Sequence, residues 1–414
     1  MSQEKNSINR RNFLKTVAAT GVGSAIASTK LLADANDPNI SDPNAAQKPK
    51  PPAFPMRDFG NKGFKVPCFT LGVMFNALDQ IAILRKALQL GVYFWDCAYS
   101  YANGNAEVAI GKILAEQPEL RKKMLITSKS GGTPEELENH LQESLKRLNT
   151  NYIDIYYGVH GLDNPELLTE DLRKWSEDAK KRKLIRFFGF STHSNMAGCL
   201  MAASKAGWID AIITSYNFRV MQDEQMQQAV EACHKAGVAL VAMKTQAGRQ
   251  RIENDKDKEL IEYFTKKGFT EGQAKIKAVL QDKRICSACV GLGRGNIEHL
   301  VLGVDAVLDK RPLDDKDVAF LTDYARKTCD GYCAGCSQIC SKASPDMPYI
   351  ADVMRHLMYY NSYGDHEMAR ELFAQLPAAA KSRLLTADYS LAEARCPNRL
   401  PIANLIKEAS AKLA

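Results

Sequence analysis

Short apolar runs alternate with longer amphipathic segments between about residues 56 and 310. The short runs are rich in β-branched and aromatic residues and indicate buried strands, whereas 134–147 and 222–236 have the spacing of amphipathic helices. Strands that alternate with helices in this way predict an α/β fold, a (β/α)8 TIM barrel. An open doubly wound sheet is the alternative, but no Gly-rich phosphate turn follows the first strand. The eight predicted strands end near Val73, Ala98, Ser128, Val159, Thr192, Tyr216, Lys244 and Gly291.

Two regions depart from this regular alternation. Residues 250–283 are longer than one crossover between strands needs, which predicts an extra helix or a lid. We divide the folded part into a barrel at 56–310 and a small α-helical segment at 311–414. In the second part helical patterns follow one another without strands, at 314–328, 350–361, 366–376 and 402–413.

The first 35 residues have the composition of a targeting segment. Arg10 and Arg11 precede Phe13, and a short, weakly apolar run follows from 16 to 27. This pattern resembles a twin-arginine signal peptide, which exports folded proteins, and a basic, frayed helix is the alternative. The run is too short for a permanent membrane span. We therefore expect the twin-arginine export machinery as a partner and a periplasmic or otherwise exported location.

Residues 36–55 contain six prolines among polar residues and predict an extended linker. The formal net charge of +7 over 414 residues is modest. No block of Lys or Arg lies beside aromatic residues, as a nucleic-acid groove would require, so we expect no nucleic-acid partner.

Polar side chains follow three neighbouring strands of the predicted barrel. Asp96, Lys129 and His160 each lie at the end of an apolar run, and Tyr101 follows Asp96 by five residues. Because the carboxyl ends of parallel strands meet at one end of a barrel, we expect these four side chains to lie together. An ammonium beside a phenol favours the phenolate, so Lys129 is expected to lower the pKa of Tyr101 toward neutral pH.

These four residues, in this order, resemble the catalytic tetrad of the aldo/keto reductases. Residues 57–66 look like the short hairpin that opens their barrels, and the resemblance covers about 56–310. It implies a reversible carbonyl-to-alcohol conversion of a small carbonyl or sugar-like substrate with NADP(H) or NAD(H). Tyr101 would be the acid, Lys129 and Asp96 would tune it, and His160 would position the carbonyl.

The same resemblance implies that later strand ends hold the nicotinamide dinucleotide. Thr192 stands where Asn is usual, and no Gln precedes Tyr216, so this part of the pattern is incomplete. The departures support an alternative function, an electron-transfer or binding protein whose barrel has lost nicotinamide-dependent hydride chemistry. The expected cofactor-binding residues are Ser191, Thr192, Asn217, Lys244, Gly293, Arg294 and Asn296.

Six of the eleven cysteines lie in predicted strands or helices and are expected to be buried apolar residues. Two of them, Cys286 and Cys289, have C-x2-C spacing. Strand alternation would point these two side chains to opposite faces of the barrel wall, which argues against a shared metal site.

Four cysteines, by contrast, crowd between residues 329 and 340. Three of them with a distant Cys-Pro pair resemble the bacterial ferredoxin pattern, which implies one [4Fe–4S] cluster and a redox partner. A disulfide framework and a structural zinc site are the alternatives. Cys329 is a spare cysteine or replaces one ligand. The expected ligands are Cys333, Cys336, Cys340 and Cys396.

Overall fold

The computed structural model describes residues 52–248, 255–293, 295–347 and 349–414. The predicted signal peptide at 1–35, most of the predicted linker and Arg294 lie outside the described residues.

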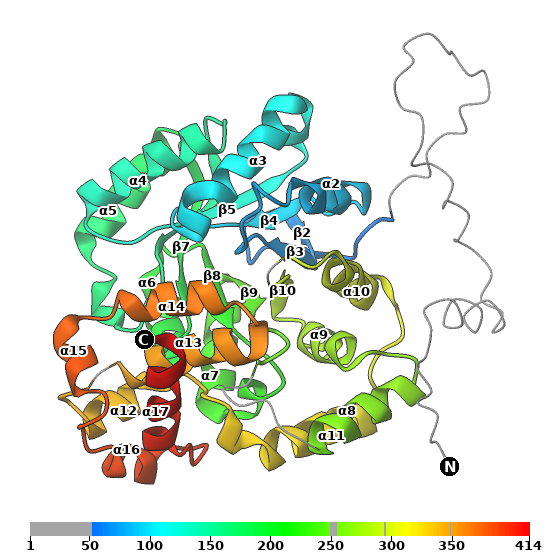
Figure 1. Ribbon diagram of the computed structural model, residues 1–414. Helices are drawn as coiled ribbons and strands as arrows, with labels where there is room; N and C mark the ends of the chain where they lie inside the picture. The colour runs from blue at the N-terminus through cyan, green and yellow to red at the C-terminus, as the bar shows by residue number, and fades with distance from the viewer. Residues whose placement is uncertain (1–51, 249–254, 294, 348) are drawn as a thin grey trace, which may run out of the picture. The chain divides into compact units, whose positions relative to one another are not determined.

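Eight parallel strands close into a barrel, which confirms the predicted fold (Figure 1). Each strand ends within about three residues of the predicted position. The apolar run that predicts a strand has the same length as the stretch of chain that crosses the barrel wall, so both end at nearly the same residue. The strands in order around the barrel are β3 (Phe69–Gly72), β4 (Phe94–Asp96), β5 (Leu125–Lys129), β6 (Ile153–Val159), β7 (Ile185–Thr192), β8 (Ala211–Ser215), β9 (Ala239–Met243) and β10 (Ile285–Gly291).

An antiparallel hairpin of β1 (Met56–Asp58) and β2 (Lys65–Pro67) precedes the barrel, as the sequence predicts. Phe59 and Val66 pack in one apolar cluster with interior barrel residues. The backbone N–H of Asn61 donates to the carbonyl of Gly237, just before β9. The hairpin therefore closes the amino-terminal end of the barrel and leaves the carboxyl end for chemistry.

Helices cover the outside of the barrel (Figure 1). The helix α4 (Pro134–Arg147) begins at a capping box. The Thr133 hydroxyl accepts a hydrogen bond from the backbone N–H of Glu136, and the Glu136 carboxylate accepts one from the backbone N–H of Thr133. An extra helix, α8 (Asp255–Lys266), precedes α9 and confirms the insertion predicted before the last strand. The other barrel helices are α2 (Ile81–Gln89), α3 (Asn105–Glu116), α4 (Pro134–Arg147), α5 (Glu170–Lys181), α6 (Met196–Ala206), α7 (Glu224–Lys235), α9 (Glu271–Gln281) and α10 (Ile297–Leu308).

One prediction about the barrel interior is wrong. Cys286 and Cys289 both belong to the interior apolar cluster and do not lie on opposite faces. The register between β9 and β10 shifts between Ile285 and Ser287, and this irregularity breaks the strict alternation on which the prediction depended.

The chain after the barrel is entirely helical in its described part. Its first helix, α11, packs on the barrel, where Phe320 stacks on Tyr263 with ring centroids 4.0 Å apart. A second apolar core begins at Cys340 and joins α13, α14 and α17. The domain boundary at residue 310 stays a prediction. The helices are α11 (Asp315–Lys327), α12 (Ser337–Ala343), α13 (Ile350–Tyr363), α14 (His366–Ala374), α15 (Ala378–Arg383), α16 (Ser390–Arg395) and α17 (Ile402–Leu413).

In the described ranges, we find no helix with the length and apolar character that a membrane crossing needs.

Candidate active site and cysteine pocket

The four predicted tetrad residues meet at the carboxyl end of the barrel. Asp96 ends β4, Lys129 ends β5, and His160 follows β6. Lys129 Nζ donates to Asp96 Oδ2 at 2.7 Å and to the carbonyl of Cys97 at 2.7 Å. The same nitrogen lies 4.9 Å from the centroid of the Tyr101 ring, and His160 meets that ring edge-on at 5.8 Å. A phenol, a buried ion pair and an imidazole therefore share one site.

The ion pair keeps Lys129 charged. Burial lowers the pKa of Lys129, but the neighbouring Asp96 carboxylate and the Tyr101 phenol outweigh burial and raise this pKa above its ordinary value. Asp96 is held in turn by the Thr127 hydroxyl, which donates to Oδ1 at 2.5 Å. The site thus contains a fixed ammonium directly beneath the Tyr101 ring.

The expected lowering of the Tyr101 pKa does not occur. Burial raises the pKa of Tyr101, and the opposing charge of Lys129 does not compensate for it. The phenol therefore stays protonated at neutral pH, as a proton donor to a carbonyl must. Sequence reasoning included the charge of Lys129 but not the burial of the phenol.

Tyr101 and Tyr99 point to different surroundings. Tyr99 packs against His140, with ring centroids 4.3 Å apart, and under the guanidinium of Arg147.

The two residues after Tyr101, Ala102 and Asn103, both adopt left-handed backbone with φ of 48° and 54°. Non-glycine residues rarely adopt this conformation, so the turn that presents Tyr101 is strained.

His160 is neutral at neutral pH. Burial, followed by the charges of Lys129, Arg355 and Lys244, lowers the pKa of His160 to about 3. A neutral imidazole can hydrogen-bond to a substrate oxygen without repelling the Lys129 ammonium.

The predicted dinucleotide positions are occupied by other contacts. Ser191 and Thr192 are fully buried; the Ser191 hydroxyl accepts from the backbone of Gly161 at 2.9 Å, and the Thr192 hydroxyl donates to the carbonyl of Ser194 at 2.9 Å. Asn296 caps the start of α10, where its side chain accepts from the backbone of Glu298.

Tyrosines of the C-terminal segment hydrogen-bond to two further positions, and the backbone of a third tyrosine passes near Gly293. The side chain of Asn217 donates to the Tyr332 hydroxyl at 3.0 Å. Lys244 Nζ donates to the Tyr359 hydroxyl at 2.6 Å. A Cβ atom at Gly293 would lie 3.3 Å from the carbonyl oxygen of Tyr363. A nicotinamide dinucleotide therefore does not fit on these positions while the C-terminal segment lies here.

Sequence reasoning missed the side chains that α13 contributes to the barrel mouth. Arg355, Tyr359 and Tyr363 are spaced by four residues and therefore lie on one face of the helix. Burial raises the pKa of Tyr359, but Lys244 and Arg355 outweigh it and hold this pKa below its ordinary value. The spacing of a cation and two aromatic residues within an apolar helix is the signal that could have identified this face.

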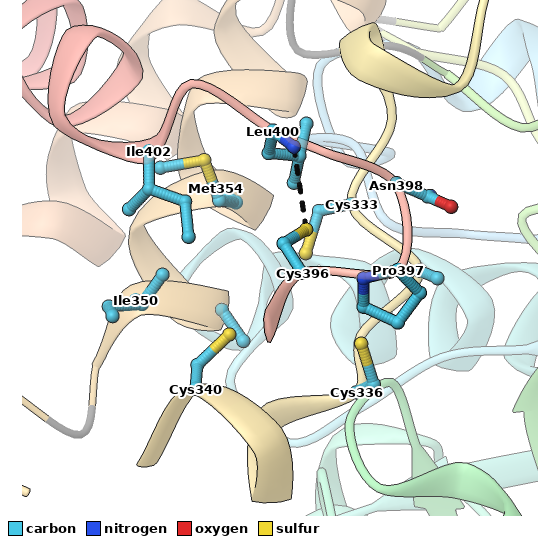
Figure 2. Close-up of a pocket in the computed structure, with 12 residues that line it drawn as sticks. Cys333, Cys336, Cys340, Ile350, Met354, Cys396, Pro397, Asn398, Leu400 and Ile402 are labelled. Atoms are coloured by element: carbon cyan, nitrogen blue, oxygen red, sulfur yellow. Dashed lines mark hydrogen bonds between the residues drawn. The ribbon is translucent and has the colours of Figure 1, made fainter. Parts of the chain in front are cut away.

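The four predicted cluster ligands line one pocket (Figure 2). Apolar side chains of Ile350, Met354, Leu400 and Ile402 complete its wall. The backbone N–H of Leu400 donates to Cys396 Sγ at 3.4 Å. Cys329 does not line this pocket.

The pocket cysteines are free thiols, of which Cys340 and Cys396 are buried and Cys333 and Cys336 are partly exposed. Burial, followed by the neighbouring sulfurs, raises the pKa of Cys336 to about 12 and that of Cys340 to about 11. The eleven cysteines all lie within the described ranges, and no disulfide forms among them. No three His, Cys, Asp or Glu side chains of the described residues are placed so that they could hold a single metal ion.

Comparison with known proteins identifies the family. A model of the aldo/keto reductase family matches residues 70–287, just over half of the chain. The chain belongs to the aldo/keto reductase family. The match contains the tetrad positions and ends shortly before the last strand does. The helical segment with the cysteine pocket lies beyond the matched residues.

Two relatives match part of this chain. Aldo-keto reductase AFTS1 of Alternaria alternata is 26% identical over 200 residues, which are 40% of this chain and 54% of that protein. L-glyceraldehyde 3-phosphate reductase of Escherichia coli K12 is 32% identical over 155 residues, 33% of this chain and 44% of that protein. This chain thus spans about half the length of these relatives.

Two solved structures share the fold. Aldo-keto reductase AKR11C1 from Bacillus halodurans, in its holo form, is 18% identical with a TM-score of 0.55, covering 66% of this chain and 96% of that one. A thermostable aldo-keto reductase, Tm1743, solved with the inhibitor epalrestat, is 24% identical with the same TM-score, covering 66% of this chain and 100% of that one. Both likenesses concern the barrel architecture.

Proposed function

We propose that this protein is an oxidoreductase that interconverts a carbonyl and an alcohol at the carboxyl end of its barrel. One observation carries the proposal: Lys129, paired with Asp96 at 2.7 Å, lies beneath the ring of Tyr101 and beside the neutral His160. A barrel rim that only needed polar caps has no reason to bury an ion pair under a phenol.

Each tetrad residue has a defined task in this reaction. The protonated phenol of Tyr101 donates its proton to the carbonyl oxygen, and the Lys129 ammonium stabilises the phenolate that remains. Asp96 holds the ammonium in place by a charge-assisted hydrogen bond. His160, which is neutral, orients the carbonyl oxygen beside the phenol. In the reverse direction the phenolate accepts the proton of an alcohol.

Family membership implies a nicotinamide dinucleotide, NADP(H) or NAD(H), which would supply the hydride when bound. The side chains of Asn217 and Lys244, two of its expected contacts, are already hydrogen-bonded to Tyr332 and Tyr359, so we derive no step through it. This observation favours a second candidate function, a protein of this fold that has given up nicotinamide-dependent hydride transfer for electron transfer or binding.

Anaerobically purified protein should be tested with a panel of small aldehydes, ketones and sugars, with NADPH, NADH and a reduced viologen dye as separate reductants. Tyr101→Phe should abolish turnover with either kind of reductant, because only Tyr101 supplies the proton. Tyr99→Phe is the matched control and should retain it. Turnover of the Tyr101→Phe protein at the wild-type rate would contradict the proposed reaction. Reduction of the protein by the dye without turnover of any carbonyl, together with no response to NADPH or NADH, would select the second function.

The C-terminal segment is proposed to hold one [4Fe–4S] cluster on Cys333, Cys336, Cys340 and Cys396. Four thiols on one apolar pocket, a backbone N–H directed at Cys396 and the Cys-Pro pair support this assignment. Each iron of such a cluster takes one thiolate, so its ligands stand farther apart than those of a single ion. A cluster supplies one-electron redox chemistry and would exchange electrons with a redox partner.

Export by the twin-arginine pathway is proposed from the paired arginines at 10 and 11 and the weakly apolar run that follows. This route carries folded proteins, so a cofactor can be inserted before export. The corresponding location is the periplasm or an equivalent exported compartment.

A further inference from the structure

Asn195 joins two loops at the carboxyl end of the barrel. It lies three residues beyond β7, at the start of α6. Its backbone N–H donates to the carbonyl of Gly335 at 2.7 Å, and its side-chain amide donates to the carbonyl of Asp163 at 2.8 Å. Gly335 belongs to the C-terminal segment, whereas Asp163 follows His160 by three residues. One residue therefore connects the C-terminal segment with the loop that carries a member of the tetrad.

Gly335 lies in the short stretch 333–336, which we call the cysteine loop, between Cys333 and Cys336. Its φ is 77°, and a Cβ atom here would overlap the carbonyl oxygen of His193. No side chain fits in that space, and the left-handed backbone also favours glycine. The cysteine loop therefore rests directly on the barrel, just beyond the end of β7.

The side chain of Asn195 does not play the role that its position predicts. An asparagine at the N-cap of a helix usually accepts a hydrogen bond from a backbone N–H of the first turn. Asn195 makes no such bond to α6, and its φ of 46° lies in the left-handed region and not in the extended region of an ordinary N-cap. The local sequence thus offers a second arrangement, in which Asn195 turns to cap α6 and releases Asp163.

The loop that follows His160 is held by β7. The backbone N–H of Gly161 donates to the Ser191 hydroxyl at 2.9 Å, and that of Leu162 donates to the Ser191 carbonyl at 2.8 Å. The His160 ring meets the Tyr101 ring edge-on, with centroids 5.8 Å apart. Movement of this loop would therefore change the distance between the imidazole and the phenol.

We propose that Asn195 is a positioning residue for His160, and that it acts while the cysteine loop is seated on the barrel. The bond to Gly335 keeps Asn195 in its left-handed conformation, and this conformation directs the side-chain amide at Asp163. Without that bond, Asn195 relaxes to the capping arrangement, and the loop of His160 loses one of its attachments. The C-terminal segment thereby completes the tetrad.

The inference rests on the proposed function in one respect, the task of His160, which orients the carbonyl. Gly335 lies between two of the proposed cluster ligands, Cys333 and Cys336. Binding of a cluster by these cysteines would favour the seated loop, because a ligand shifts a protein toward the arrangement that binds it. The content of the cysteine pocket would then influence the carbonyl site through Asn195.

Hydrogen exchange of the full-length protein, purified anaerobically with its cofactors retained, tests the link without any substrate. Asn195→Asp and Asn195→Gly remove the side-chain donor to Asp163. In both variants the amides of Gly161 and Leu162 should exchange about tenfold faster than in the wild type, because the loop would open more often. Strand β5 should exchange as in the wild type, which shows that the barrel stays folded.

Gly335→Ala tests the part of the cysteine loop. It should accelerate the same two amides, because the added methyl group would lift the loop from the barrel. Gly364→Ala is its matched control, since Gly364 also has a positive φ but has open space where a Cβ would lie. Asn149→Gly is the control for Asn195, because Asn149 is likewise left-handed and lies before β6, at the other end of the barrel. Both controls should exchange as the wild type does at this loop.

Turnover of DL-glyceraldehyde with NADPH or a reduced viologen dye gives the second readout. Asn195→Gly should lower kcat/KM about tenfold, because a misplaced His160 orients the carbonyl poorly. In a protein that already contains His160→Ala, Asn195→Gly should cause no further loss. A residue with a merely structural role would lower kcat/KM in both backgrounds.

Wild-type exchange of the two amides in both Asn195 variants would overturn the positioning role, and wild-type exchange in Gly335→Ala would remove the cysteine loop from it. Independent losses of kcat/KM from Asn195→Gly and His160→Ala would also overturn it. Tyr101→Phe should lose turnover but keep wild-type exchange of the loop, which separates failure of the carbonyl chemistry from failure of the link. The exchange rates decide the link also where the wild type does not turn over glyceraldehyde.

Discussion

Lys244, one residue beyond β9, donates a 2.6 Å hydrogen bond to the hydroxyl of Tyr359 on α13. Asn217, two residues beyond β8, makes a similar bond to Tyr332. Each bond joins residues 115 positions apart in the sequence. The C-terminal segment is therefore tied to two neighbouring strand ends and forms part of the wall of the barrel mouth.

Opening this contact should admit a dinucleotide. If α13 occupies the cofactor path, Tyr359→Ala should bind NADPH about tenfold more tightly than the wild type. The variant lacks the hydrogen bond between Tyr359 and Lys244, so α13 would cover the cofactor path in a smaller fraction of the molecules. Fluorescence titration with NADPH measures this. Tyr360→Ala is the control, since Tyr360 stacks on His366 on another face of the helix. Equal affinities for the wild type and Tyr359→Ala would contradict the competition.

The ammonium beneath Tyr101 should be required for proton transfer. Lys129→Met should lower turnover by about 10²-fold or more, because the Tyr101 phenolate would lose its stabilising charge. Steady-state kinetics with a competent carbonyl substrate measure the loss. Lys180→Met, which breaks an ion pair with Asp210 elsewhere on the barrel, is the control for lost stability and should keep its turnover. Similar rates in the two variants would remove Lys129 from the mechanism.

Acid should destabilise the protein through its buried imidazoles. Burial, with the charges of Arg355 and Lys244, lowers the pKa of His356 to about 3. The unfolded chain binds this proton near pH 6.5 and the folded chain does not until about pH 3, so the free energy of unfolding falls as the pH decreases through this window. Above it, the contribution is fully present.

Replacing His356 should make this dependence shallower. His356→Gln should reduce the slope between about pH 6.5 and 3 by about 1.4 kcal/mol per pH unit. Chemical denaturation at several pH values, followed by tryptophan fluorescence, measures it. His299→Gln changes an exposed residue of α10 and should leave the slope as it is. An unchanged slope in His356→Gln would show that this imidazole is not kept neutral.

Removing one cysteine of the pocket should release iron. Cys396→Ser should lose iron and acid-labile sulfide and make residues 329–414 sensitive to protease, because the cluster would clamp the loop at 396 to the loop at 333. Cys329→Ser should retain the metal, since Cys329 lies outside the pocket. Wild-type protein without iron after anaerobic purification, or equal losses in the two variants, would argue against the cluster.

Replacing the paired arginines should stop export. Arg10→Lys together with Arg11→Lys should leave the precursor in the cytoplasm, because the export receptor distinguishes guanidinium groups from ammonium groups. Cell fractionation measures the distribution of the protein. Lys30→Arg is the control and should be exported normally. Normal export of the double variant would exclude the twin-arginine route.

The sequence alone determined the barrel and the meeting of the tetrad. Strand positions follow from local runs of apolar residues, and closure of parallel strands brings their carboxyl ends together whatever the outer helices do. Asp96, Lys129 and His160 could therefore be placed from strand ends alone. The nearness of Cys333, Cys336 and Cys340 likewise followed from their spacing within eight residues, whereas Cys396 was expected there from the resemblance to ferredoxins.

Only the tertiary structure decided which residues cover the carboxyl end of the barrel and how burial changes the pKa values of the residues there. The contacts of Tyr332 and Tyr359 with the barrel join distant parts of the chain, and local periodicity carries no information about such packing. The shift in β10 that turns Cys286 and Cys289 to the same side arises from pairing with β9, which alternation along a single strand cannot reveal. The pKa of Tyr101 depends on how completely its neighbours exclude water, and that is a property of the assembled site.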